Sequence, residues 1–336
     1  MPKKKDHITI KEVAQKSGVS ISTVSRALSG GANVSEDIKR RVMNAASDLK
    51  YEPNMAAQML KGAPLKALGL IMPNVSAVMF PSIVKGIEDE AFPNGYSLFI
   101  CNTDERRDIE EQYIDSFTRR SIDGIIFMTA HINNTRIVDL HKKGFPVIAL
   151  NRHIPKVTDA VVMDNYWGGY KNADYLISKG IRKIAYLDGW NYLELYRQRI
   201  KAVRKRLSES GFEIPEKMYF KNLDALDDGY AATKELFESG QRPEAIIAAS
   251  DLKAIGAIKA LNELKMQIPK DISIISFDNI DISQWINPAL TTMAQPFYKM
   301  GRQSCRRLLE RIASKTPLKE TTFAIKGDLI IRDSVI

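Results

Sequence analysis

The sequence lacks most of the features that mark secreted, membrane-spanning or metal-dependent proteins. Only two cysteines, Cys101 and Cys305, occur in 336 residues, and four scattered histidines give no metal-ligand spacing. The longest apolar runs, such as residues 68–72 and 245–249, are far shorter than the roughly 18 residues that cross a bilayer. The first residues carry charge in place of the apolar segment of a signal peptide. We therefore expect a cytoplasmic protein with two reduced thiols and no membrane partner.

Short motifs that carry catalysis are also missing. The sequence contains no GxGxxG, GxxxxGK[ST], GxSxG or HExxH pattern, and local context suggests no Ser/His/Asp set. Its 44% hydrophobic and 26% charged residues nevertheless describe a globular chain with more than one packed core. We expect a noncatalytic protein with no cofactor and no metal.

Positive charge is concentrated at the amino end. Residues 1–62 carry 11 Lys and Arg against 6 Asp and Glu, whereas the remaining residues carry 38 against 34. A small basic domain on a nearly neutral body is typical of nucleic-acid binders, because neutralising phosphates supplies most of their sequence-independent affinity. A solubilising tail would give the same charge distribution, so charge alone leaves both interpretations open.

Three short helices are predicted within this basic segment. Residues 9–12 form a capping box that starts one helix, and Gly18 ends it. Ser20 caps a second helix over 21–29, and Ser35 starts a third. In a helix-turn-helix the second helix enters the major groove, where short polar side chains and an arginine reach bases and phosphates. Two short helices joined by a glycine turn also occur without any role in DNA binding.

A longer run of residues is more specific. The segment Ile10-Lys-Glu-Val-Ala-Gln-Lys-Ser-Gly-Val-Ser-Ile-Ser-Thr-Val-Ser-Arg-Ala-Leu-Ser29 resembles the DNA-binding headpiece of the lactose-repressor (LacI/GalR) family of bacterial transcription regulators. The resemblance implies a headpiece over 1–53, in which Ile21 and Ser22 choose the operator bases. Caps such as Thr9 and Ser20 would be needed with or without DNA. The candidate DNA contacts of the headpiece are Thr9, Ser20, Ile21, Ser22, Thr23, Ser25, Arg26 and Asn33.

A hinge is expected over 54–64. Its helical candidate has about two turns, which is too short to be stable alone in water. The family resemblance implies that it folds on DNA against its dimer mate and that Leu60 inserts into a minor-groove base step. Without the resemblance, Leu60 would be an ordinary apolar linker residue. The candidate hinge contacts are Asn54, Ala57, Gln58 and Leu60.

From Leu68 onward, short apolar runs alternate with amphipathic helices, which predicts an α/β fold of two doubly wound lobes with parallel sheets. Ligands of such folds lie at the carboxyl ends of strands, here between the lobes. The resemblance covers residues 8–333 and implies a periplasmic-binding-protein-like core over 65–336 that binds an effector and dimerises. It implies lobe one at about 65–163 and 294–322, lobe two at about 164–293 and 323–333, and chain crossings near 164, 293 and 323.

Residue by residue, the resemblance also implies an effector pocket. Arg199 and Asp278 would be its polar anchors, since a guanidinium and a carboxylate hold hydroxyl pairs. Arg199 could instead be solvated on its helix, and Asp278 could be a strand-end cap. Asn151 and Ser250 replace a usual Asp and a usual Asn, so no relative's ligand transfers directly. The candidate effector contacts are Met79, Phe80, Ile83, Asn151, Trp190, Arg199, Ser250, Asp278 and Phe297.

These features together predict a DNA-binding transcriptional regulator, most simply a repressor. We expect a homodimer that reads a pseudo-palindromic operator, because two-fold protein symmetry matches two-fold DNA symmetry. The chain ends without a leucine heptad tail, which favours a dimer over a tetramer. The expected effector is a sugar or sugar phosphate, with a purine or nucleoside as the alternative. A plain noncatalytic solute-binding protein would have the same lobes but no headpiece.

Overall fold

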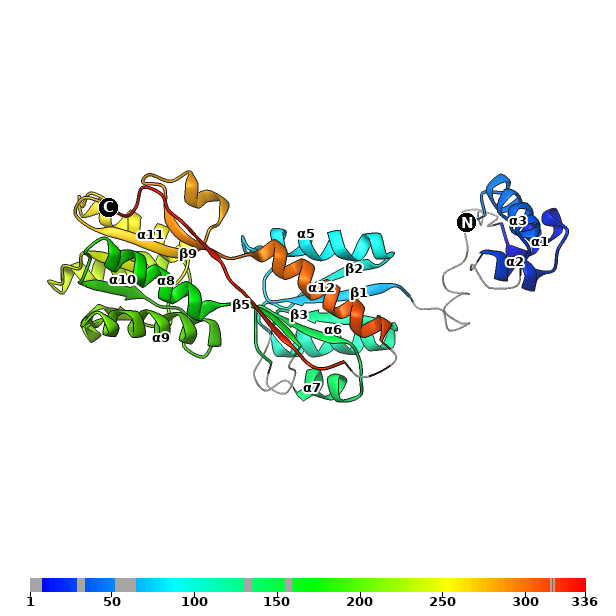
Figure 1. Cartoon of the computed structure of the whole chain (residues 1–336), viewed down its shortest axis with the longest axis horizontal. Helices are drawn as coiled ribbons and strands as arrows, with labels where there is room; N and C mark the ends of the chain where they lie inside the picture. The colour runs from blue at the N-terminus through cyan, green and yellow to red at the C-terminus, as the bar shows by residue number, and fades with distance from the viewer. Residues whose placement is uncertain are drawn as a thin grey trace, which may run out of the picture. The chain divides into compact units, whose positions relative to one another are not determined.

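The chain divides into two compact units, Met1–Leu65 and Lys66–Ile336 (Figure 1). The computed structural model describes residues 8–28, 34–51, 65–129, 135–154, 159–314, 316 and 318–336. Asn33 and the hinge candidates Asn54, Ala57, Gln58 and Leu60 lie outside the described residues. None of the helices within these ranges is both long and apolar enough to span a bilayer.

The first unit contains the three predicted helices: α1 (Ile10–Ser17), α2 (Ile21–Leu28) and α3 (Glu36–Asp48). The capping box forms as expected, since the Thr9 backbone N–H donates to Glu12 Oε2 at 2.6 Å. Gly18 ends α1 in the left-handed region, with φ of +68°. The three helices share one core of small side chains: Val13, Ala14, Val24, Ala27, Val42, Ala45 and Ala46.

Lobe one is built on a six-stranded parallel sheet. Its strands are β1 (Ala67–Met72), β2 (Ser97–Asn102), β3 (Gly124–Phe127), β4 (Val147–Leu150), β5 (Ala160–Met163) and β11 (Thr322–Ile325), in the order β11-β5-β4-β3-β1-β2. Its helices are α5 (Phe80–Ala91), the short η1 (Phe92–Asn94), α6 (Arg107–Arg119), α7 (Thr135–Lys142) and α12 (Phe297–Ala313).

In lobe one, α5 and α12 lie side by side (Figure 1). Their backbones approach closely at Gly86, where an added Cβ would stand 2.2 Å from the Tyr298 carbonyl oxygen. A larger residue there would separate the two helices, so the glycine is required by packing.

Lobe two repeats the layered arrangement. Its strands are β6 (Ile184–Leu187), β7 (Tyr219–Phe220), β8 (Ala245–Ala248), β9 (Ser273–Asp278), β10 (Thr291–Ala294) and β12 (Asp328–Ile330), in the order β12-β10-β9-β8-β6-β7. All pairs are parallel except β10 with β12. Its helices are α8 (Asn165–Ser178), α9 (Glu194–Glu209), α10 (Leu226–Glu238) and α11 (Asp251–Glu263), with the short η2 (Glu216–Met218) and η3 (Asp281–Gln284). The predicted helical headpiece followed by two α/β lobes is therefore confirmed.

The chain crosses between the lobes three times. The first crossing follows Met163, the second lies between Ala294 and Phe297, and the third between Ile325 and Asp328. The last two fall a few residues later than the expected 293 and 323. The third crossing lies later than expected because Thr322–Ile325 still pair with β5 in lobe one.

Candidate DNA-reading helix and interlobe cavity

Helix α2 separates a buried face from an exposed one. Val24 and Ala27 are buried in the headpiece core, whereas Ile21, Ser22 and Arg26 are exposed. The exposed residues are therefore available to a ligand without disturbing the core.

Hydrogen bonds within the first turn of α2 fix its polar side chains. Ser20 Oγ accepts from the Thr23 backbone N–H at 3.2 Å and so caps the helix. The same oxygen lies 2.8 Å from Ser22 Oγ and 2.9 Å from Thr23 Oγ1. Arg26 Nε donates to the Ser22 carbonyl oxygen at 3.3 Å, which holds the guanidinium along the helix. The remaining candidates differ in exposure: Thr9 is exposed and Ser25 is half-buried.

A cavity of about 540 Å³ lies between the two lobes of the second unit; we call it the interlobe cavity. Its wall includes the end of β4, the first crossing, the loop before α9 and the first turn of α9. This volume is in the range of small-molecule sites. Of the nine candidate effector residues, Asn151 lines the cavity, at the end of β4 with φ of +59°. Sequence reasoning missed the polar wall residues Arg152, His153, Asn165, Glu194, Arg197 and Gln198.

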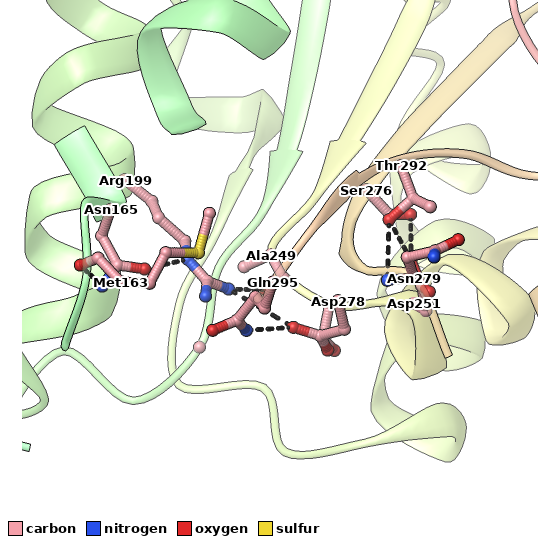
Figure 2. Close-up of polar contacts among 12 residues, drawn as sticks. Met163, Asn165, Arg199, Ala249, Asp251, Ser276, Asp278, Asn279, Thr292 and Gln295 are labelled. Atoms are coloured by element: carbon pink, nitrogen blue, oxygen red, sulfur yellow. Dashed lines mark hydrogen bonds and ion pairs between the residues drawn. The ribbon is translucent and has the colours of Figure 1, made fainter. Parts of the chain in front are cut away.

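Arg199 lies behind the cavity wall. Its side chain is 2% exposed, so the alternative of a solvated position is wrong. Nε donates to Asn165 Oδ1 at 2.8 Å, and Nη1 donates to the Ala249 carbonyl oxygen at 2.6 Å (Figure 2). Its guanidinium also stacks 4.2 Å from the centre of the Phe277 ring. Because Asn165 lines the cavity, Arg199 is connected to the cavity through the Asn165 side chain.

Asp278 ends β9 and is the nearest carboxylate to Arg199, with 4.0 Å from Nη1 to Oδ1. Its backbone is in an unusual conformation, with φ of +113°. Burial raises the pKa of Asp278, and the charge of Arg199 opposes that rise. The two polar anchors named from the sequence are thus brought together by the fold.

Gln295 joins this pair from the second crossing. Its Nε2 donates to Asp278 Oδ1 at 2.5 Å (Figure 2). Its Oε1 is buried and finds no hydrogen-bond partner among the described residues. A buried acceptor without a donor is costly, so this oxygen marks a point where a ligand hydroxyl would be stabilising.

Two further buried charges flank the pair, and neither was named from the sequence. Asp251 accepts from Ser276 Oγ at 2.5 Å, from Thr292 Oγ1 at 2.7 Å and from the Ile280 backbone N–H at 2.8 Å. Burial raises the pKa of Asp251, and the negative charge of Asp278 adds to the rise. The signal that points to it is its place as the first residue of α11, three positions after the buried strand β8 ends at Ala248.

Lys253 is the second buried cation of lobe two, at 1% exposed. Its Nζ donates to the Asp224 carbonyl oxygen at 2.8 Å and to Ser250 Oγ at 3.3 Å. Burial lowers the pKa of Lys253 to about 8. Ser250 itself caps α11, accepting from the Lys253 backbone N–H at 3.4 Å.

The apolar effector candidates fall into two groups. Phe80, Ile83 and Phe297 are buried in the lobe-one core, where Met79 packs against them from the start of α5. Trp190 is instead 38% exposed, and its Nε1 donates to Asp224 Oδ1 at 3.4 Å.

Comparison with known proteins agrees with this geometry. Residues 9–54 match the model for bacterial regulatory proteins of the lacI family, and residues 173–335 match the periplasmic binding protein-like domain. The HTH-type transcriptional regulator RegA of Clostridium saccharobutylicum is 31% identical, covering 98% of this chain and 99% of its own.

Solved structures show the same fold. The lac repressor dimer bound to operator and an anti-inducer has a TM-score of 0.85 at 23% identity, covering 97% of this chain and 98% of that chain. A LacI family regulator from Enterococcus faecium with bound ribose has a TM-score of 0.71 at 30% identity, covering 80% and 98%. Members of the family are DNA-binding regulators and not enzymes. This chain belongs to the lacI family of bacterial regulatory proteins and is a DNA-binding transcriptional regulator.

Proposed function

We propose that the protein is a repressor whose operator affinity is controlled by a small carbohydrate, free or phosphorylated, bound between the lobes. The observation that carries this proposal is the unpartnered Gln295 Oε1 beside Asp278 and Arg199. A carboxylate and a free acceptor within one cluster suit a ligand that presents several hydroxyl groups, while Arg199, buried behind the cavity wall, pairs with Asp278.

The position of the cavity supports control by an effector. Its wall takes Asn151 and Arg152 from lobe one and Tyr192 and Gln198 from lobe two. A ligand that contacts both lobes favours the lobe arrangement in which those contacts are best. Its effect on DNA binding is limited by the difference between its affinities for the two arrangements.

DNA binding is assigned to the exposed face of α2. Ile21 and Ser22 would reach base edges, and Arg26 would reach phosphate or base. Small side chains at the first two positions offer no bidentate base contact, so part of the operator specificity must come from the shape of the DNA. The protein would act in the cytoplasm.

A homodimer is proposed because apolar side chains are exposed at the edge of lobe one. Strand β2 is the last strand of its sheet, and its Phe99 and Ile100 are exposed, as is the neighbouring Phe92. An unpaired apolar strand edge is avoided in monomers, so a second copy of the chain is the simplest cover. Sedimentation should give a dimer, and a salt-stable tetramer would contradict the assignment.

The effector class is tested with a thermal-shift screen of sugars, sugar phosphates, purines and nucleosides. A ligand at 100 times its dissociation constant should stabilise the core by about 2.7 kcal/mol. We expect a sugar or sugar phosphate to raise Tm in the wild type and to change operator affinity in fluorescence anisotropy.

Two variants make the screen specific. Asp278→Ala should abolish both responses while operator binding remains, whereas Asp281→Ala, at an exposed aspartate of η3, should retain them. A purine or nucleoside as the active compound, or a sugar response that survives Asp278→Ala, would contradict the proposal.

A further inference from the structure

Two large aromatic side chains lie exposed beside the interlobe cavity. Trp190 is 38% exposed and Tyr192 is 51% exposed, on the loop between β6 and α9. Their ring centres are 6.0 Å apart and the ring planes meet at 41°. Tyr192 lines the cavity, so the pair extends the cavity wall outward to the surface. An exposed aromatic cluster next to a cavity marks a binding surface, whereas single exposed apolar residues are common and indicate no function.

The loop that carries the pair is held by hydrogen bonds to the segment after β7. The Asn191 backbone N–H donates to Asn222 Oδ1 at 3.1 Å, and the Asn222 backbone N–H donates to the Gly189 carbonyl oxygen at 3.1 Å. The indole of Trp190 is tied to Asp224 Oδ1 at 3.4 Å. The loop backbone and the Trp190 indole are therefore positioned before any ligand arrives, which lowers the entropy cost of binding.

Polar groups surround the aromatic pair. The Asp224 carboxylate adjoins the Trp190 indole, and the Asn222 side chain lies under the same loop. A pyranose presents an apolar face of C–H groups and a rim of hydroxyls. Aromatic faces bordered by carboxylate and amide oxygens match both parts of such a ring.

Both arginines of the cavity wall are already paired with carboxylates. Arg152 Nη2 donates to Glu105 Oε1 at 3.2 Å, and Arg197 Nε donates to Glu194 Oε2 at 2.9 Å. Asp164 caps α8 by accepting from the Trp167 backbone N–H at 2.8 Å. Because both arginines of the wall are already paired with carboxylates, the wall favours a neutral ligand over a phosphate or a carboxylate.

We propose that Trp190 and Tyr192 form a second sugar subsite at the mouth of the interlobe cavity, so that the effector is a neutral oligosaccharide of at least two pyranose units. One unit occupies the cavity and the next stacks on the aromatic pair. This inference rests on the carbohydrate effector proposed above and adds its size and charge.

The test compares the binding of mono- and disaccharides by titration calorimetry. The probes are glucose, galactose, maltose, cellobiose, lactose and glucose 6-phosphate. The variants are Trp190→Ala and Tyr192→Ala, with Trp285→Ala as the matched control, since Trp285 is 77% exposed beside η3 and outside the cavity wall. We expect at least one disaccharide to bind more tightly than its component monosaccharide and than glucose 6-phosphate. Its dissociation constant should rise about tenfold in each of the two loop variants, as expected for the loss of one stacking ring, and remain unchanged in Trp285→Ala.

A second readout does not depend on truncating a ring. The chain has three tryptophans, so the disaccharide should change the emission of the wild type and of Trp285→Phe, but much less that of Trp190→Phe. Disaccharide binding that is equal in Trp190→Ala, Tyr192→Ala and wild type would overturn the subsite and leave the carbohydrate effector standing. Preferred binding of glucose or glucose 6-phosphate would also overturn it. Binding of no saccharide in the thermal screen would overturn both proposals.

Discussion

The headpiece and the core differ in where their candidate functional residues lie: those of the headpiece are exposed, whereas the two polar anchors of the core are buried. In the headpiece, Ser22 and Arg26 are exposed on a helix whose other face is buried. In lobe two, Arg199 and Asp278 are themselves buried among strand ends. Side chains that bind from the surface can change without affecting the fold, whereas buried ones contribute to stability and to binding at once.

The energetic consequences differ in the same way. The buried side chains of the headpiece core are valines and alanines, with larger apolar residues only partly buried around them, and so small a core leaves little stability to lose. Lobe two buries Arg199 and Lys253 with Asp251 and Asp278, and each charge is tolerated because its neighbours compensate it. Removing one of these charged side chains leaves the others buried without a compensating charge, which lowers the stability of the fold.

The largest expected effect comes from removing a member of the buried cluster. Asp278→Ala leaves Arg199 without its carboxylate and Gln295 without its acceptor. We expect the free energy of unfolding of the core to fall by about 3 kcal/mol, as for other broken buried pairs. Urea denaturation monitored by far-UV circular dichroism measures it.

Asp278→Asn is the matched variant, because it keeps the size and the acceptor oxygen. Since burial already raises the pKa of Asp278, a neutral replacement should cost less, about 1 kcal/mol. Equal losses in the two variants would show that packing and not charge compensation stabilises this edge of the sheet.

The next effect is on DNA binding without any loss of stability. Arg26→Ala removes an exposed guanidinium from α2 and should weaken operator binding by about 100-fold, as for a lost base or phosphate contact of the stronger kind. Its melting temperature should equal that of the wild type. Anisotropy titrations on an operator duplex at fixed salt measure the affinity.

The control for Arg26 is Arg40→Ala, on the exposed face of α3, where the guanidinium pairs with Asp37. We expect a change of less than threefold in operator affinity for this variant. Similar losses at Arg26 and Arg40 would reduce the headpiece to a nonspecific basic surface.

The contrast between the units also explains what the sequence can predict. The caps at Thr9 and Ser35 and the spacing of Val13, Val24 and Val42 are local signals, and they gave the three helices and their core. In the body, apolar runs gave the strands, and these signals need only neighbours in the chain. Asp278 and Ser250 were instead named from the family resemblance.

Other features depend on contacts that are distant in the sequence. Gln295 lies 17 residues after Asp278 and meets it through the second crossing, and Asn165 meets Arg199 across 34 residues. The burial of Phe80 in the lobe-one core follows from packing around α5 and α12, which a helix-start motif does not specify. Arg199 and Asp278 were therefore named through the family resemblance, whereas Asn165 and Gln295, which contact them, were not named.

A smaller effect should separate the stabilities of the two units. Val42→Ala removes two methyl groups from the fully buried centre of the headpiece core and should cost about 2 kcal/mol. Because that core is small, we expect the headpiece to melt at lower temperature while the main core transition stays in place. Differential scanning calorimetry resolves the two transitions. A shift of both transitions together would mean that the units unfold as one.

The smallest effect tests the buried charges by pH. Unfolded Lys253 keeps its proton up to about 10.5, whereas burial lowers the pKa of the folded lysine to about 8, opposed by the charge of Asp278. Between these values the unfolded chain binds more protons, so wild-type stability gains from this group as pH rises. The gain in the free energy of unfolding from pH 8 to pH 9 should be about 1 kcal/mol.

Lys253→Met should lack this gain, so the stability of the wild type, plotted against pH, should rise relative to that of the variant over this interval. Lys259→Met, at an exposed position of the same helix, should follow the wild type. Parallel pH dependences for wild type and Lys253→Met would mean that the buried ammonium is compensated as fully as an exposed one. The buried charges of the core would then not differ in energy from the exposed charges of the headpiece.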